Sequence, residues 1–498
     1  MNLSLLLRET ARAHAEKTAL FCRSAGGSSE VTFGAIDEAA DRVAAGLIGR
    51  GVAPGDRVVL GMTNVPHFAY AYYGALRAGA TVVPLNPTLT AVETERILED
   101  SGAKVVLATP GFAERAVTPA AAELGSSIEI VSTDDWDIAF PSAGPIEDIE
   151  VDGDDLAILA YTSGTTGEPK GVMLSHGNLR ANLEQQMAVP DADVREDDIL
   201  LLALPLFHIF GLNVTLGLLV MTGASGLLVE QFEPVDVLTA MQEVGVTVIF
   251  GAPTLYIALV NTPGADQYDL SKVRLAISGA AALAPGVLRS FKELFGVQIY
   301  EGYGLTETAP TVTSNRITGE ARPGSIGRPV PGLELRLVDE GGDDVELGDP
   351  GEIVVRGPNV FKGYWGHEED TANAFFGDWF RTGDVAVLDE EGYLYLVDRK
   401  RDLIIVSGFN VYPSEVEEAL IEHPAILEAA VIGVPHQYTG EAVKAYVALQ
   451  PGTEATEEEL LAYVGDRLAR FKCPRSIEIV AELPHLLTGK VLKRALRS

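Results

Sequence analysis

Apolar and polar positions alternate along the chain with two different periods. From Thr32 to Val131, short runs of Val, Leu and Ile are separated by longer segments in which apolar residues recur every three or four positions. Short runs are typical of buried strands and the longer pattern of amphipathic helices. The pattern predicts helices over 39–51, 66–78 and 92–101, and strands over 57–60, 81–84 and 104–108. Strands that alternate with helices of ten or more residues indicate parallel βαβ units.

The same cycle resumes in the second third of the chain. Strands are predicted over 199–203, 226–229, 247–250, 273–278 and 298–300. In such sheets a ligand binds beyond the carboxyl ends of the strands. We therefore expect three loops to line a pocket, namely 205–211, 279–283 and 301–308.

Residues 324–398 change in character. Short strands, such as 332–338 and 352–357, are separated by Gly, Pro and Asp turns, and the charged stretch 398–402 precedes about a hundred residues of α+β pattern. The fold class predicted is α/β: a large N-terminal domain (1–400) of parallel βαβ sheets with a β-rich subdomain, and a small α+β C-terminal domain (401–498).

Length, charge and cysteine content narrow the class of protein. A chain of 498 residues needs more than one core. Its net charge of −34 argues against sequence-independent nucleic-acid binding. Cys22 and Cys473 form no disulfide or metal-binding pattern, which favours the cytoplasm. Residues 1–14 lack the features of a signal peptide. The apolar stretch 211–223 is shorter than the roughly 20 residues of a transmembrane helix, so we expect a soluble protein.

The stretch 161–171, Tyr-Thr-Ser-Gly-Thr-Thr-Gly-Glu-Pro-Lys-Gly, follows the apolar run 156–160. Its glycines allow backbone amides to turn toward an anion, its hydroxyls add donors, and Lys170 adds a cation. It is therefore predicted to be a phosphate-binding loop after a strand. It is not a Walker A loop, because Pro169 stands where glycine is required. The plainer interpretation is a surface turn rich in Ser, Thr and Gly.

This stretch resembles the signature of the adenylate-forming superfamily, which includes acyl-CoA synthetases, coumarate-CoA ligases, luciferases and adenylation domains of peptide synthetases. Further motifs similar to those of the family occur in the family's order from about residue 30 to Arg497. The resemblance implies that ATP is bound by Thr162, Ser163, Gly164, Thr165, Thr166, Gly167 and Lys170.

The motif 301–307, Glu-Gly-Tyr-Gly-Leu-Thr-Glu, narrowly misses the dinucleotide pattern G-x-G-x-x-G. The resemblance implies that Tyr303 stacks on adenine, that Thr306 contacts the α-phosphate and that Glu307 binds Mg²⁺, which proteins usually hold with one or two carboxylates. Glu301, Gly302 and Gly304 then belong to the same nucleotide site. The alternative is a strand-to-helix turn with a capping glutamate.

Two apolar loops resemble the family's acyl-binding segments. Gly279 and Ala280, in Ser-Gly-Ala-Ala-Ala-Leu, are implied to form a wall of the acyl tunnel and to touch adenine, although tight packing would also explain small residues there. His208, in Pro-Leu-Phe-His-Ile-Phe-Gly, matches the family histidine beside the acyl carboxylate. We interpret it as a gate or positioning residue and not as a general base.

The remaining motifs lie toward the C-terminus. The resemblance implies that Asp384 holds the ribose hydroxyls, that Arg399 in the motif starting at Tyr395 contacts ribose or phosphate, and that Arg401 is a hinge. Ser407 and Gly408 match the loop that approaches the pantetheine thiol. Lys490 matches the adenylation lysine, whose charge would offset that of the reacting carboxylate and α-phosphate.

The resemblance implies an ATP- and Mg²⁺-dependent enzyme in which a mobile C-terminal domain closes the site. A carboxylic acid is activated as acyl-AMP and passed to CoA or, alternatively, to the phosphopantetheine of an acyl carrier protein. We expect a medium- or long-chain fatty acid, because no arginine near His208 would suit a dicarboxylic acid. A luciferase-type oxygenase and a non-catalytic acyl-nucleotide sensor are further alternatives, and a homodimer is compatible with the sequence.

Overall fold

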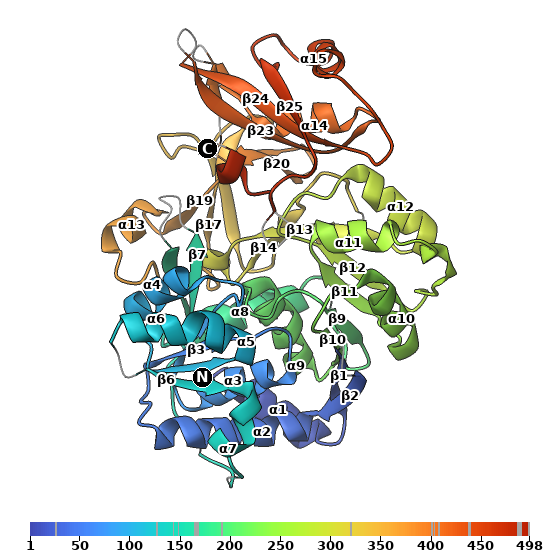
Figure 1. Ribbon diagram of the computed structural model, residues 1–498. Coiled ribbons are helices and arrows are strands. Elements are labelled where there is room, and N and C mark those ends of the chain that lie inside the picture. Colours follow the sequence, from blue (N-terminus) through green and yellow to red (C-terminus); the bar gives the residue numbers. More distant parts are fainter. Residues whose placement is uncertain are drawn as a thin grey trace. The chain divides into compact units, whose positions relative to one another are not determined.

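The computed structural model describes two compact units (Figure 1). The first contains residues 1–323, 327–334 and 356–378, and the second contains 324–326, 335–355 and 379–498. The residues described are 1–24, 27–125, 128–142, 144–147, 149–163, 169–190, 193–318, 321–399, 402, 404–406, 409–436, 440–485 and 491–496. The division at residue 400 stays a prediction.

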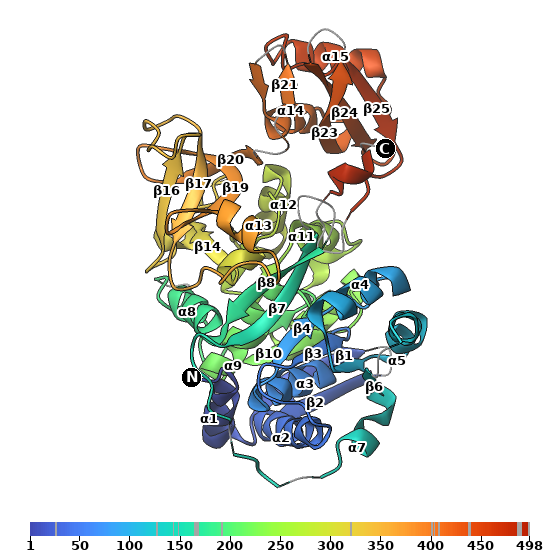
Figure 2. The same ribbon diagram turned by 90° about the vertical axis from the view of Figure 1, so that its left-hand side faces the viewer.

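A six-stranded sheet in the first unit has the order β6-β5-β3-β4-β7-β8. Its strands are β3 (Arg57–Gly61), β4 (Thr81–Pro84), β5 (Val105–Ala108), β6 (Glu129–Ser132), β7 (Leu156–Ser163) and β8 (Pro169–Ser175). All neighbours are parallel except β7 and β8, which form an antiparallel hairpin that Figure 2 shows as two long adjacent arrows. The predicted strands β3, β4 and β5 are confirmed.

Helices connect these strands, as the βαβ pattern predicts. They are α2 (Phe33–Gly49), α3 (Pro66–Arg77) and α4 (Ala91–Ser101). Helix α2 begins earlier than predicted because the Thr32 side chain caps it, accepting a hydrogen bond from the backbone N–H of Ala35. Thr90 and Glu93 cap α4 in the same way with a reciprocal capping box.

A nine-stranded sheet completes the first unit, in the order β15-β14-β13-β12-β11-β9-β10-β1-β2. The parallel strands are β1 (Thr18–Ser24), β9 (Ile199–Leu202), β10 (Ser225–Val229), β11 (Val248–Gly251), β12 (Leu275–Ser278) and β13 (Ile299–Gly304). The antiparallel strands β2 (Gly27–Thr32), β14 (Thr311–Ser314) and β15 (Arg328–Pro329) form its two edges. The five strands predicted between 199 and 300 are confirmed.

The other helices of the first unit are mostly short. They are α1 (Ser4–His14), α5 (Pro110–Phe112), η1 (Ala113–Val117), α6 (Thr118–Glu123), η2 (Thr133–Asp135), α7 (Trp136–Ala139), α8 (His176–Met187), η3 (Phe210–Gly217), α9 (Leu218–Thr222), α10 (Pro234–Val244), α11 (Pro253–Val260), η4 (Ala265–Gln267), α12 (Pro285–Phe295), η5 (Thr306–Thr308), η6 (Asn315–Thr318) and α13 (Glu368–Asn373). Strand β18 (Phe375–Phe376) also lies in this part of the chain. None of the helices in the described ranges has the length and apolar composition needed to cross a membrane.

The second unit is built mainly of strands. Strand β17 (Gly351–Arg356) lies between β16 (Glu334–Val338) and β19 (Trp379–Leu388), and β20 (Leu394–Arg399) pairs with β19. A further sheet has the order β22-β21-β24-β23, with β25 on β24. Its elements are β21 (Ile404–Val406), β22 (Phe409–Val411), α14 (Pro413–Ile421), β23 (Ile426–His436), β24 (Gly440–Leu449), α15 (Glu457–Gly465), β25 (Ser476–Val480) and η7 (Lys493–Leu496). The predicted fold class, including the β-rich part and the C-terminal α+β part, is confirmed.

Candidate functional site

Both ends of the predicted phosphate-binding stretch, 161–171, belong to strands. Strand β7 continues through Ser163 and β8 begins at Pro169, with Thr162 opposite Lys170 in the register of the hairpin. The prediction of loop for 161–163 and 169–171 is therefore wrong. Gly164, Thr165, Thr166 and Gly167 lie outside the described residues, as does the side chain of Ser163.

Lys170 is buried and paired. Its Nζ lies 2.7 Å from Oδ2 of Asp370, and 5.7 Å from the centre of the Tyr364 ring. The hydrogen bond from Lys170 lowers the pKa of Asp370, and Nδ1 of His367 lies 3.3 Å from the same carboxylate oxygen. In this structure the charge of Lys170 is thus offset by a carboxylate.

Glu307 lies in η5, directly after β13. The hydroxyl of Tyr364 donates a hydrogen bond of 3.0 Å to its Oε1, and the backbone N–H of Phe361 donates one of 2.8 Å to its carbonyl. Burial and the neighbouring Glu307 carboxylate raise the pKa of Tyr364. The phenol therefore stays protonated and acts as a donor.

Residues 301–304 form the end of β13 and not a loop, so the loop prediction is wrong for this part of the motif. Antiparallel pairing with β14 extends the strand, with Gly302 opposite Ser314 and Tyr303 opposite Thr313. A Cβ on Gly304 would stand 2.0 Å from the carbonyl oxygen of Pro310. Glycine at this position is therefore required by the close return of the chain.

The loop after β12 is fixed from both sides. The backbone N–H of Leu283 donates a hydrogen bond to Oε1 of the buried Glu301, and a Cβ on Gly279 would lie 3.1 Å from the Phe210 ring. Ala280 has a φ of 73°, which is unusual for a residue with a side chain. Close packing thus accounts for part of the small-residue pattern, while contacts of Gly279 and Ala280 with a ligand stay a prediction.

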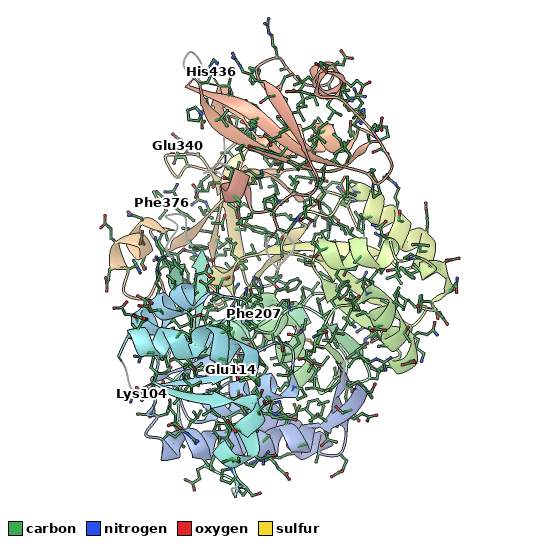
Figure 3. The ribbon with its side chains drawn as sticks, viewed as in Figure 1. Lys104, Glu114, Phe207, Glu340, Phe376 and His436 are labelled. Carbon is green, nitrogen blue, oxygen red and sulfur yellow. The ribbon has the colours of Figure 1, made fainter. Side chains whose placement is uncertain are left out.

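His208 lies in the predicted loop between β9 and η3, next to Phe207, which Figure 3 labels. Burial lowers its pKa to about 4, so the imidazole is neutral at pH 7. Its Nδ1 accepts a hydrogen bond of 3.3 Å from the backbone N–H of Phe210. The proton of the neutral ring is therefore on Nε2, which is left as a donor suited to a carboxylate.

A group of buried amide side chains, which the sequence motifs do not reveal, holds the turn that follows Glu307. Asn182 in α8 donates to the carbonyl of Thr311 and accepts from its N–H, at 2.9 and 3.1 Å. Asn359 donates to the carbonyl of Thr308, and Asn213 to that of Ala309, both at 2.7 Å. The spacing of polar residues in α8 was the available signal, but it is also typical of an exposed helix face.

Two predicted ribose-binding residues are neighbours in the second unit. Asp384 in β19 pairs with Arg399 in β20 in the register of the two strands, and its carboxylate is buried. The hydroxyl of Tyr395 is 3.4 Å from Oδ2 of Asp389. The Arg399 side chain and the predicted residues Arg401, Ser407, Gly408 and Lys490 lie outside the described part of the chain.

Basic residues of the C-terminal part are mostly engaged with neighbours. Lys444, Lys472 and Arg467 lie 2.9, 2.5 and 3.7 Å from carboxylate oxygens of Glu478, Glu415 and Glu422 respectively. Arg475 lies 2.7 Å from Nε2 of His436, which is labelled in Figure 3. These four cations are therefore already engaged with side chains of the same unit.

The described residues contain no group of three or more His, Cys, Asp or Glu side chains arranged for a metal ion. A magnesium ion that arrives with a nucleotide needs only one or two protein carboxylates. Glu307, with a hydrogen-bonded and partly exposed carboxylate, fits that requirement.

Comparison with known proteins agrees with the motifs. Residues 7–365 match the family described as AMP-binding enzyme, and residues 415–490 match its C-terminal domain family. The chain is 37% identical to a long-chain-fatty-acid–CoA ligase of Bacillus subtilis (strain 168), over 99% of this chain and 94% of the relative. It is 38% identical to a feruloyl-CoA synthase of Amycolatopsis sp, over 95% and 94% of the two chains.

Among solved structures, ATP-bound MatB from Rhodopseudomonas palustris is similar with a TM-score of 0.91 and 35% identity, covering 100% of this chain and 98% of that one. The resemblance inferred from the motifs is thus confirmed. Because the family match spans residues 7–365 and the identities extend over nearly the whole chain, the chain belongs to the AMP-binding enzyme family, as an acid–thiol ligase of its acyl-CoA synthetase group.

Proposed function

We propose that this enzyme joins a medium- or long-chain fatty acid to CoA at the expense of ATP, through an acyl-AMP intermediate. The main support for this proposal is that two of the predicted motifs, 161–171 and 301–307, are connected within the first unit. The hairpin that carries the phosphate motif and the carboxylate of Glu307 are linked through one segment, 361–365, which bonds to both.

In the first half-reaction, an oxygen of the ionised acid attacks the α-phosphorus of ATP. The new O–P bond forms as the bond to pyrophosphate breaks, so acyl-AMP remains and pyrophosphate leaves. No general base is needed because the acid is already ionised at pH 7. His208 donates from Nε2 to the acid carboxylate, Thr306 contacts the α-phosphate, and Tyr303, with Gly279 and Ala280, holds adenine.

The negative charge of the ATP phosphates and of the acid carboxylate would be offset by a bound magnesium ion and by Lys490. Glu307 would hold magnesium, which supplies positive charge at the phosphates when bound. Lys490 would offset the charge of the carboxylate and α-phosphate. Asp384 accepts from the ribose hydroxyls, a role that suits an ionised carboxylate.

In the second half-reaction, the thiol of CoA gives its proton to solvent and its sulfur forms a bond to the acyl carbonyl carbon, while the bond from that carbon to the AMP oxygen breaks and AMP leaves with the former carboxylate oxygen. We propose that residues 401–498 turn about Arg401 between the two halves, removing Lys490 and presenting Ser407 and Gly408 to the thiol.

The class of acid rests on the composition of the acyl loops. No Lys or Arg occurs in 205–217 or 279–285, which disfavours a second carboxylate on the substrate. The two relatives named for their acids act on a long-chain fatty acid and on ferulate. An aromatic acid that outperforms every fatty acid in direct competition would overturn our choice.

For the acceptor, CoA is favoured because both relatives are named for the formation of CoA thioesters. The product mass obtained with CoA and with a holo acyl carrier protein separates the alternatives. Failure to form acyl-CoA at any concentration would overturn CoA. We keep the cytoplasm as the proposed location, because both cysteines are free thiols.

Pyrophosphate release from MgATP across a panel of carboxylic acids tests the proposal. We expect release that depends on one class of acid and that falls strongly in Lys490→Ala, while transfer from supplied acyl-AMP to CoA continues. A folded wild-type protein that binds ATP but releases no pyrophosphate with any acid would favour a sensor. Light emission with a luciferin would favour the oxygenase.

A further inference from the structure

The segment 361–365 runs along the outer edge of β8 like an additional short strand. The N–H of Lys362 donates to the carbonyl of Met173, and the N–H of Met173 donates to that of Gly363, at 2.9 and 3.0 Å. The N–H of Trp365 donates to the carbonyl of Gly171 at 2.8 Å, and Tyr364 forms an antiparallel bridge with Val172. Tyr364 is therefore held in register with the strand that follows the phosphate motif.

The ring of Tyr364 is also fixed on its sides. The Phe361 ring packs edge-on against it, with centroids 4.9 Å apart, and Nζ of Lys170 lies 5.7 Å from its centre. The backbone N–H of Tyr364 donates to Oγ1 of Thr371 at 2.9 Å. A Cβ on Gly363 would lie 2.6 Å from Cγ2 of Thr371, so the chain is closely packed here. The phenol hydroxyl is thus presented to Glu307 from a rigid support.

We propose that Tyr364 is a positioning residue for the magnesium-bound nucleotide. Its hydroxyl holds the plane of the Glu307 carboxylate, and its backbone ties that carboxylate to β8 and the phosphate motif. This inference rests on the proposed role of Glu307. A carboxylate held by an outer hydrogen bond needs less ordering when a metal ion is bound, and loss of such a partner typically weakens metal binding about 10–100-fold.

The substitution Tyr364→Phe distinguishes the contribution of the hydroxyl from that of the aromatic ring. Tyr364→Phe keeps the aromatic packing and the backbone pairing, and removes only the donor to Glu307. We expect the magnesium concentration for half-maximal ATP binding, measured by calorimetry without any acid, to rise about tenfold. The thermal midpoint should change little. The matched control is Tyr446→Phe, whose hydroxyl donates to the carbonyl of Leu496 in the second unit and which should leave the magnesium dependence unchanged.

A double-mutant cycle with Glu307→Gln tests whether Tyr364 acts through Glu307. If it does, Tyr364→Phe should add less than about a twofold effect in the Glu307→Gln background, because residues that act as a unit are not additive. Equal effects of Tyr364→Phe in both backgrounds would overturn the proposal. So would a lowered thermal midpoint with unchanged magnesium dependence, which is the result expected of a purely structural tyrosine.

Failure of the underlying proposal gives a different pattern. If Glu307→Gln binds magnesium and ATP as wild type does, Glu307 is not the metal ligand and both proposals fail. If Glu307→Gln raises the magnesium concentration for half-maximal ATP binding and Tyr364→Phe does not, only the positioning role of Tyr364 fails.

Discussion

His208 illustrates how one residue's surroundings select its chemistry. Burial lowers its pKa to about 4, and the backbone N–H of Phe210 occupies Nδ1. The ring is therefore a neutral donor through Nε2 over the whole range in which an acid substrate is ionised. The loop that carries it is fixed by Gly211, where a Cβ would stand 2.3 Å from the carbonyl oxygen of Pro205. We therefore propose that His208 positions the acid and does not abstract a proton.

Replacing His208 should affect acid binding without changing the pH profile. A hydrogen bond to a charged group contributes about 1.5–3 kcal/mol, so His208→Ala should lower kcat/KM for the acid roughly 10–100-fold. His208→Asn, which keeps a donor, should lose less. Pyrophosphate release from pH 5.5 to 8 measures both effects. A wild-type inflection near pH 6.5 that disappears in His208→Ala would instead identify a general base.

At the scale of elements, helix α8 connects the β7–β8 hairpin to the turn after Glu307. It begins directly after β8, where Ser175 and Asn178 form a reciprocal cap. Asn182, one turn further, bonds both peptide groups of Thr311, and Gln185 donates to Oδ1 of Asn359 at 3.1 Å. The helix thus transmits the position of the hairpin to the backbone that supports Glu307.

Loss of Asn182 should therefore reduce stability. Asn182→Ala removes the two buried hydrogen bonds to Thr311, together with those to the Gln185 and Gln186 side chains, at a cost of about 2–3 kcal/mol. The thermal midpoint should fall by roughly 4–8 °C in a scanning calorimeter. Glu184→Ala, on the exposed face of the same helix, removes only a surface ion pair with Arg180 and should change the midpoint by less than about 2 °C. Equal shifts in the two variants would contradict the role given to Asn182.

The sequence predicts those helices and strands that can be recognised from the pattern of neighbouring residues alone. Buried strands such as β5 and β9 are continuous apolar runs, so their positions follow from burial alone. The extent of β7, β8 and β13 was missed because Gly, Thr and Pro are turn residues, and only antiparallel pairing makes them strands there. The contacts of Tyr364 with Glu307 and of Lys170 with Asp370 join distant positions, which no local pattern can reveal.

At the scale of the whole molecule, one buried histidine joins the start of the chain to α8. The backbone N–H of Leu3 donates a hydrogen bond of 3.0 Å to Nδ1 of His176. Burial, and secondarily the N-terminal ammonium group, lower the pKa of His176 to about 4. The neutral ring is therefore preferred in the folded state, whereas a histidine in the unfolded chain has a pKa of about 6.5.

The sign of the resulting pH dependence follows from linkage. The contribution of neutral His176 to the free energy of unfolding is fully present above about pH 6.5. It is lost as the pH falls from there through 4, because His176 binds a proton more readily in the unfolded chain than in the folded protein. The total amounts to about 3 kcal/mol. The thermal midpoint between pH 7 and 4.5 should therefore fall less steeply in His176→Gln than in wild type. Parallel curves would show that His176 does not contribute.

The segment 361–365 also has a consequence for biosynthesis. An uncovered strand edge is a template for pairing with another chain. Strand β8 is complete at Ser175, but the backbone groups that cover its edge belong to residues made only when synthesis reaches Trp365. The nascent chain thus carries an open sheet edge through most of the synthesis of its first unit. The period in which it is exposed to self-association ends when the segment that supports Glu307 closes that edge.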